Sequence, residues 1–255
     1  MASIGDQHRM TVIDHLGELR KRLVISIVSI AVGMVAAFIQ KDWVFAVIKR
    51  PLERMDGVNT DLVTFSPTEP FMTVLRVSIY AGLMLALPIV LWQIWAFILP
   101  ALYENEKRGV LPYVFFTTFL FVAGVAFAYF AVLPVGLSFL VGYGGDIFLQ
   151  QLRASEYIGF VTLFLLAFGA VFEMPAVMLL LTAADLVNHV TLKRVRKYAV
   201  VGIAVAAMVL TPSQDPVSML LMMGPLVALY ELGILLSRLA GRRKAKRRAK
   251  EAAAE

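Results

Sequence analysis

Two short segments beside long apolar runs carry carboxylates suited to binding cations. The segment DHLGELRKRL places Glu18 in a basic cluster just before the first apolar run, and PALYENEKRG presents Glu104 and Glu106 after a later run. If both segments lie at one rim of the protein, two carboxylates can engage two guanidinium groups. A planar guanidinium suits this task because it bonds a carboxylate bidentately. Such a rim would bind a pair of arginines.

Local pairing is the alternative for each of these carboxylates. Apolar residues recur at helical spacing around Glu18, so we expect an amphipathic helix there. On that helix Arg22 follows Glu18 by four residues, and such a pair is worth only about 0.3 to 0.5 kcal/mol. Glu106 could likewise pair with Lys107 or Arg108 in a solvated turn. The residues alone leave both alternatives open.

A second group of charged residues lies within or beside the apolar runs. Glu173, in FGAVFEMP, falls near the middle of a run, where a charge costs roughly 2.5 to 3.5 kcal/mol and marks a functional candidate. The alternative is structural: the carboxyl bonds another helix and the nearby proline kinks the run. Glu231 lies closer to a run's end and is expected to be structural or to face a partner helix. Arg76 and Asp215 could pair with one another or with Glu69, which we also expect to be structural.

The composition requires a membrane protein. Apolar residues make up 60% of the 255 residues and charged residues 16%, which is more apolar surface than a soluble core of this size can bury. Backbone groups in lipid must be satisfied within each segment, so we expect an all-α, polytopic protein. A run of about 20 residues spans the roughly 30 Å hydrocarbon layer. Six transmembrane helices are expected, at 23–39, 71–99, 110–133, 158–182, 198–210 and 217–237.

These spans organise the chain as one membrane domain over residues 1–255. It comprises an amphipathic helix (1–22), a six-span bundle (23–237) with an outer loop at 40–70, and a basic tail (238–255). The span 198–210 is short, because about 13 residues at 1.5 Å each reach only about 20 Å. The proline-rich link TPSQDP then makes the last two spans a short hairpin.

Basic residues predict which side of the membrane each loop faces. Of the 24 Lys and Arg residues, 18 fall on one side: four before 23–39, two before 110–133, four before 198–210 and eight after 217–237. Both termini are therefore expected in the cytoplasm. The basic tail follows a span directly, which favours contact with anionic lipid over nucleic acid.

Catalytic and metal chemistry find little support in the residues. The chain has no cysteine, and His8, His15 and His189 form no pair at helical ligand spacing. No phosphate-binding loop is present, so neither a cofactor nor a metal is expected. An intramembrane protease is not supported, because the chain has no Gly-x-Ser-Gly motif to supply a serine nucleophile. The segment GYGGD also misses the Gly-x-Gly-Asp spacing of membrane aspartyl enzymes. We therefore do not expect an enzyme.

Five segments follow one another in order along the chain: HLGELRKRL, SPTEPF, WQIWAFILPALYENEKR, FGAVFEMP and TPSQDP. Together they resemble TatC, the signal-receptor subunit of the twin-arginine protein translocase, over all but the first ten residues and the basic tail. The resemblance implies a cup-shaped bundle of six helices with both termini in the cytoplasm. It also implies a cytoplasmic patch that binds the paired arginines of signal peptides on folded cargo.

The resemblance assigns residues to that patch. Its two glutamates correspond to Glu18 and Glu106, with supporting roles for Arg20, Arg22 and Phe97, whereas Glu104 occupies a position that is not reliably acidic in the family. Glu173 corresponds to an intramembrane glutamate on the concave face. The implied partners are single-span TatA-type and TatB-type proteins near the last two spans, with several copies of this chain in one receptor complex. The proton-motive force would drive transport across a prokaryotic cytoplasmic membrane.

A proton-coupled permease for small solutes is the other function that the residues allow. In that case Glu173 would be the coupling carboxylate. Such a permease would take up its substrate alone in vesicles, whereas a receptor would transport nothing without its partners.

Overall fold

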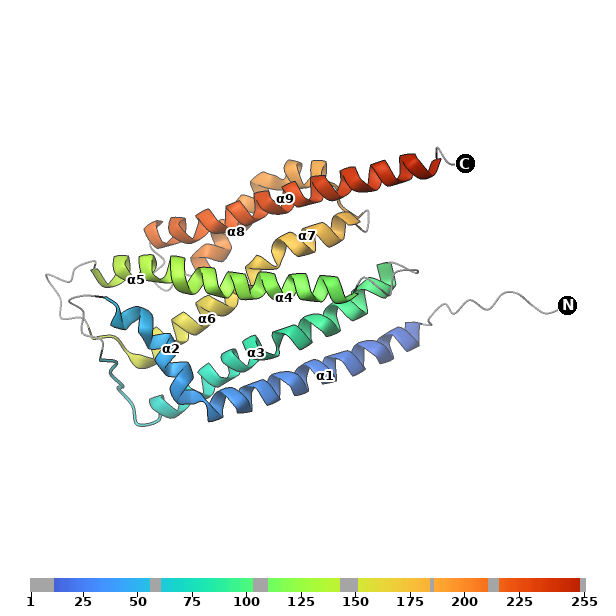
Figure 1. The fold of residues 1–255 in the computed structure, drawn as a ribbon. Coiled ribbons are helices and arrows are strands. Elements are labelled where there is room, and N and C mark those ends of the chain that lie inside the picture. Colours follow the sequence, from blue (N-terminus) through green and yellow to red (C-terminus); the bar gives the residue numbers. More distant parts are fainter. Residues whose placement is uncertain are drawn as a thin grey trace.

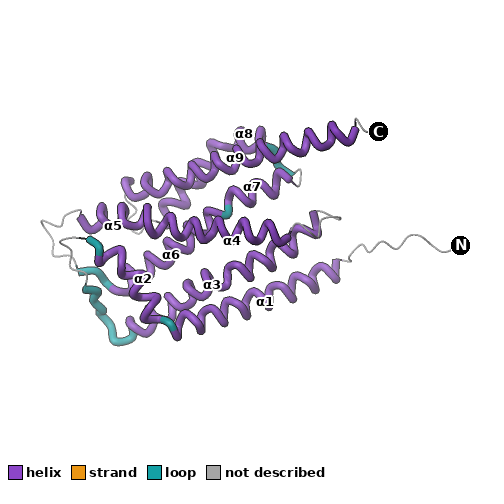
Figure 2. Tube along the Cα trace, in the orientation of Figure 1, coloured by secondary structure: helices purple, strands orange, loops and turns teal. Residues whose placement is uncertain are grey.

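The structure is a computed structural model that describes residues 12–55, 61–102, 110–142, 151–183, 186–210 and 216–252. Within these ranges the chain is helical apart from short connections and one isolated bridge between Val63 and Arg153 (Figure 1; Figure 2). The elements are α1 (Val12–Ile39), α2 (Lys41–Glu53), α3 (Glu69–Leu102), α4 (Val110–Phe127), the π-helix η2 (Ala128–Val132), α5 (Leu133–Gly142), α6 (Ala154–Phe172), α7 (Met174–Ala183), α8 (His189–Leu210) and α9 (Pro216–Ala252). The expected all-α class is confirmed.

Five stretches in the described ranges are long and apolar enough to cross a membrane. They are His15–Ile39, Glu69–Ile98, Leu111–Gly142, Ala154–Thr182 and Met222–Gly241. The expected span 198–210 forms the apolar half of α8 and is not among the five, because the other half of that helix is strongly basic. The helix therefore exists where it was expected, but its apolar part is short. Nor does α9 stop at the expected boundary of the basic tail, since it continues to Ala252.

The helices cross the bundle in alternating directions. Figure 1 shows that α1 begins and α9 ends at one end of the bundle, where α3 also ends and α4 begins. We call this the terminal end. Helix α2 and the connection before α3 lie at the opposite end, which we call the α2 end. The start of α1 and the end of α9 lie on one side, which agrees with an even number of crossings between them.

Helix α6 is the central helix of the bundle. It contacts α2, α3, α4, η2, α7 and α8. Ile158, Val161 and Phe168 of this helix are almost completely buried. By contrast, α1 exposes Val28 and Val32 along its length, as expected for a helix that faces lipid.

Helices α1 and α3 approach closely at a pair of glycines. A Cβ added to Gly33 would lie 2.5 Å from the carbonyl oxygen of Gly82, and a Cβ added to Gly82 would clash with the backbone of Met34. Lipid tails are as apolar as leucine side chains, so helices in membranes associate largely through close packing at small residues. The absence of both side chains is therefore what lets the two backbones touch.

Helix α2 is fixed to the bundle by two tyrosine hydroxyls. Pro51 lies inside α2 and has no N–H, so the carbonyl of Val47, four residues earlier, lacks its helical donor. The Tyr129 hydroxyl of η2 donates to that carbonyl at 2.8 Å, and the Tyr157 hydroxyl of α6 donates to the carbonyl of Ile48 at 3.0 Å. Pro51 thus leaves the Val47 carbonyl free to accept the Tyr129 hydrogen bond, which anchors α2 to the bundle.

Two of the long apolar stretches are interrupted. Between α4 and α5 the backbone forms the π-helix η2, and between α6 and α7 it makes a turn at Glu173. The turn lies two residues before Pro175, whose ring and missing N–H disrupt the preceding helical turn. The helix is thus interrupted beside this proline, which is the part of the structural alternative for Glu173 that the backbone shows.

The glycine contact yields a prediction about stability. We expect Gly82→Ala to destabilise the protein by about 1 to 3 kcal/mol, because the added methyl group overpacks the contact with α1. Gly202→Ala is the matched control, since a Cβ there meets nothing within 4 Å. It should be neutral or stabilising by up to about 1 kcal/mol through helix propensity. Reversible unfolding in mixed detergent micelles measures both, and equal stability of the two variants would contradict the close contact.

Candidate functional site

The start of α1 forms a polar face at the terminal end. His15, Glu18 and Arg22 follow at spacings of three and four residues, so they share one face of the helix. The Arg22 Nε donates to Glu18 Oε1 at 3.1 Å, and the Nη2 atom bonds the same oxygen. The His15 ring stacks on Phe97 of α3, with centroids 4.3 Å apart and planes 13° from parallel. These contacts join the start of α1 to the last turns of α3, and we call the four residues the rim patch.

The predicted patch residues are only partly brought together. Glu18, Arg22 and Phe97 are half-buried within the rim patch, whereas Arg20 is exposed away from it. Glu106 and Glu104 lie outside the described residues. The local pairing of Glu18 with Arg22 is therefore present, as the simpler alternative predicted.

The Glu18–Arg22 pair leaves binding capacity unused. Both hydrogen bonds from Arg22 end on Oε1, and within the described ranges Oε2 of Glu18 accepts none. A carboxylate has about four acceptor positions, so Glu18 can accept further donors without losing Arg22. Sequence reasoning missed His15 because it considered histidine only as a metal ligand, although an aromatic ring one helical turn from Glu18 was visible.

Glu173 lies in the turn between α6 and α7. Its N–H donates to the carbonyl of Ala170 at 3.1 Å, and its carbonyl accepts from the N–H of Val177 at 3.0 Å. Both carboxyl oxygens are buried and have no hydrogen-bond partner among the described residues. The structural alternative, in which this carboxyl bonds another helix, is therefore not seen in the described part of the bundle.

Glu231 has a partner on the neighbouring helix. Arg196 Nε of α8 lies 2.6 Å from Glu231 Oε1 of α9. The adjacent Tyr230 hydroxyl donates to the carbonyl of Leu192 at 2.8 Å. These contacts tie α8 to α9, as the expected hairpin requires, and they support the structural reading of Glu231.

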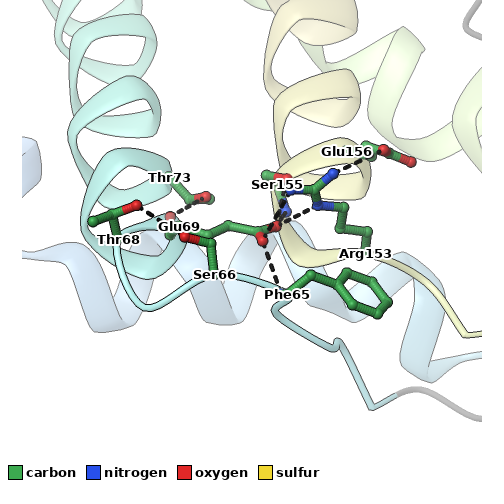
Figure 3. A network of polar contacts seen from close by, with 8 residues as sticks. All are labelled: Phe65, Ser66, Thr68, Glu69, Thr73, Arg153, Ser155 and Glu156. Carbon is green, nitrogen blue, oxygen red and sulfur yellow. Dashed lines mark hydrogen bonds and ion pairs between the residues drawn. The ribbon is translucent and has the colours of Figure 1, made fainter.

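Glu69 is the centre of a polar network at the α2 end (Figure 3). Arg153 donates to it twice, from Nε to Oε1 at 2.9 Å and from Nη2 to Oε2 at 3.2 Å. The Ser155 hydroxyl donates to Oε1 at 2.6 Å, and the Phe65 N–H donates to Oε2 at 3.0 Å. The Glu69 carboxylate raises the pKa of the Arg153 guanidinium through this hydrogen bond and its charge.

Glu69 pairs with Arg153 and, among the described residues, not with Arg76, which the sequence offered as one possible partner. Arg153 at the start of α6 and Glu69 at the start of α3 meet because both helices begin at the α2 end. Arg76 lies two turns further into α3, with its guanidinium beside Gly159. Asp215 lies outside the described residues, so its pairing with Arg76 stays a prediction.

The network closes the connection before α3 onto the bundle. Val63 N donates to the carbonyl of Leu152 at 3.0 Å, and Ala154 N donates to the carbonyl of Val63 at 2.9 Å. The Arg153 guanidinium also lies 5.7 Å from the centre of the Phe65 ring. Every contact is internal to the protein, so the network is structural. No three His, Asp or Glu side chains in the described ranges gather in a way that could hold a metal ion.

The fold and these contacts define a multi-pass helical membrane protein whose polar contacts gather at the two ends of its bundle. A family model described as "Sec-independent protein translocase protein (TatC)" matches residues 14–225. The chain belongs to this TatC family of protein translocase subunits.

Relatives from distant organisms support this assignment. The chain is 43% identical to the TatC protein of Deinococcus radiodurans over 88% of this chain and 84% of the relative. It is 40% identical to the TatC protein of Aquifex aeolicus, over 92% of this chain and 98% of the relative. It is 35% identical to a chloroplastic TATC protein of Arabidopsis thaliana, over 94% of this chain and 69% of the relative. A crystal structure titled "Twin Arginine Translocase Receptor- TatC" superposes with a TM-score of 0.81 at 39% identity, covering 89% of this chain and 99% of the other.

The Glu69 network yields a second prediction. We expect the losses in melting temperature caused by Glu69→Gln and Arg153→Gln to be strongly non-additive, because either change alone breaks the same contact. Arg153 with Glu156 is the matched control pair. Arg153 Nη1 lies 3.7 Å from Glu156 Oε1, and the Glu156 side chain is 76% exposed, against 5% for Glu69. Glu156→Gln should add to Arg153→Gln without coupling. Additive losses for Glu69 and Arg153 would contradict the network.

Proposed function

We propose that this protein is the receptor subunit of a twin-arginine translocase, which binds paired-arginine signal peptides of folded cargo at the terminal end. The supporting observation is the rim patch, in which Glu18 is oriented by Arg22 and, among the described residues, still has a carboxylate oxygen without a hydrogen bond. In the sequence, Glu106 falls between the end of α3 and the start of α4, two helix termini at the same end of the bundle. A second carboxylate there would complete a clasp for two guanidinium groups.

Phe97 and His15 would contribute a flat apolar surface beside this clasp. A guanidinium stacks readily on an aromatic face while it bonds a carboxylate. Arg20 and Arg22 would balance the acidic charges of the patch and anchor α1 at the anionic membrane surface.

The wider assignment follows from the same proposal. The terminal end faces the cytoplasm, so both termini lie on the cytoplasmic side of a prokaryotic cytoplasmic membrane. The basic residues of the loops at that end support this orientation. Residues 1–255 form one membrane domain whose basic tail contacts anionic lipid. TatA-type and TatB-type single-span proteins and further copies of this chain assemble with it, and the proton-motive force drives export.

Photocrosslinking tests the clasp. A photoreactive residue replaces the exposed Leu19, and a control residue replaces the exposed Phe65 at the α2 end. Membranes then receive a signal peptide with paired arginines or its paired-lysine counterpart. We expect crosslinks from position 19 to the arginine peptide only, with a loss of about tenfold or more in Glu18→Gln and Glu106→Lys, because charge-assisted hydrogen bonds contribute roughly 1.5 to 3 kcal/mol each.

Two outcomes of that experiment would reject the receptor assignment. One is equal crosslinking of the arginine and lysine peptides. The other is equal labelling from positions 19 and 65, which would show that the peptide does not distinguish the two ends of the bundle.

Glu173 has a separate role in the proposal. We infer that its unpartnered carboxyl organises a partner helix or a water-filled dent during transport. Glu173→Gln keeps the shape and hydrogen-bonding groups but cannot titrate, whereas Glu173→Leu loses both. We expect export of a twin-arginine reporter to be retained in the first variant and lost in the second. Loss in both, with normal amounts of protein in the membrane, would instead favour a proton relay.

A further inference from the structure

A pocket of about 430 Å³ lies at the α2 end, between α2 and the η2–α5 segment. Its walls are mainly apolar, and its polar groups are one cation and two hydroxyls. The lining residues include Arg54, Tyr129, Phe130, Pro134, Ser138 and Gly142. The rim patch and the Glu69 network both lie elsewhere, so neither accounts for this pocket.

The pocket is held in shape by the anchoring of α2. The Tyr129 hydroxyl bonds the carbonyl that Pro51 leaves without a helical donor, and Tyr157 bonds the next carbonyl. Buried Leu52 packs beneath the same turn. The π-helix η2 adds the second wall, where Tyr129 meets Phe130 edge to face at 4.9 Å. Single π-turns inside α-helices are frequent at functional sites.

Arg54 supplies the positive charge of the pocket. It follows α2 directly and is exposed. In the described part of the chain its guanidinium has no ion-pair partner. A guanidinium without such a partner, beside apolar walls, is suited to a phosphate group, because a guanidinium bonds a phosphate as it bonds a carboxylate, through two parallel hydrogen bonds.

The position of the pocket indicates which level of the lipid bilayer surrounds it. Gly142 ends the long apolar stretch Leu111–Gly142, and Ser138 lies one turn before it. Helix α2 is amphipathic and lies outside the five stretches that could cross a membrane. The pocket therefore joins a span end to an interfacial helix, at the level where lipid head groups meet acyl chains.

We propose that this pocket binds one anionic phospholipid from the leaflet at the α2 end. Arg54 bonds the phosphate, Ser138 forms the wall beside the glycerol region, and Phe130 and Pro134 contact the first part of an acyl chain. The lipid thereby fills the space between α2 and α5 and fixes the interfacial helix against the bundle. This inference does not depend on the receptor function.

A photoreactive lipid tests the proposal. Purified full-length protein in detergent is labelled with phosphatidylglycerol that carries a diazirine in its acyl chain, and labelled peptides are mapped by mass spectrometry. We expect labelling of the peptide that contains Phe130 and Pro134. Excess unlabelled phosphatidylglycerol should suppress it, whereas phosphatidylcholine and soluble glycerol phosphate should not.

Two charge variants and one steric variant locate the site. Arg54→Gln should reduce labelling of that peptide about tenfold, while the matched control Arg50→Gln, in the last turn of α2 and outside the pocket lining, should leave it within twofold. Ser138→Leu fills the pocket without changing charge and should also reduce labelling. Melting temperatures establish that each variant is folded, and if Arg54→Gln fails to fold, Ser138→Leu decides the question.

Three results would overturn the proposal. Unchanged labelling in Arg54→Gln or in Ser138→Leu would show that the pocket is not the lipid site. Equal losses in Arg54→Gln and Arg50→Gln would show a non-specific response to charge. Full competition by glycerol phosphate would identify a site for soluble phosphates instead of a lipid.

Discussion

Hydrogen bonding of the backbone in hydrocarbon constrains the rest of this structure. A polar backbone group without a partner in lipid costs several kcal/mol, so a helix can be interrupted only where other groups take over its bonds. Pro51 removes a donor at the α2 end, and the Tyr129 hydroxyl replaces it at the carbonyl of Val47. The turn at Glu173 keeps its own N–H bonded to Ala170. One of these irregular positions is thus bonded by a distant helix, and the other by its own neighbouring turns.

The carboxylates at the two ends of the bundle differ in how fully hydrogen bonds within the protein occupy their oxygens. Glu69 at the α2 end accepts bonds from Arg153, Ser155 and the backbone of Phe65, so both of its oxygens are occupied by the protein itself. Within the part of the chain that the structure describes, Glu18 at the terminal end accepts hydrogen bonds at one oxygen, from Arg22 on its own helix. A saturated carboxylate holds a fold together, whereas an oriented but unsaturated one can bind a ligand. This difference, more than charge alone, distinguishes the structural end of the bundle from the end proposed to bind signal peptides.

Hydropathy predicted the helices well because burial in lipid is a property of each segment by itself. The apolar runs correspond to α1, α3, α4–α5, α6–α7, α8 and α9, with errors mainly at their ends. Pairing between segments could not be predicted in this way. Glu69 and Arg153 are 84 residues apart, and nothing in the spacing favoured Arg153 over the nearer Arg76. The glycine contact between α1 and α3 was missed for the same reason, since Gly33 resembles any small residue in an apolar run until its neighbour is known.

Glu173 could be singled out from the sequence by local reasoning alone. A carboxyl in the middle of an apolar run contradicts the pattern around it, and such contradictions are expected where function competes with stability. In the described bundle its two oxygens are buried without a hydrogen-bond partner, so burial of this carboxyl costs stability that no contact with the described residues offsets. The turn before Pro175 places that cost at a break in the helix, where the backbone is already displaced. Such a position is consistent with the role that we propose for Glu173, in which a partner helix or water meets the carboxyl during transport.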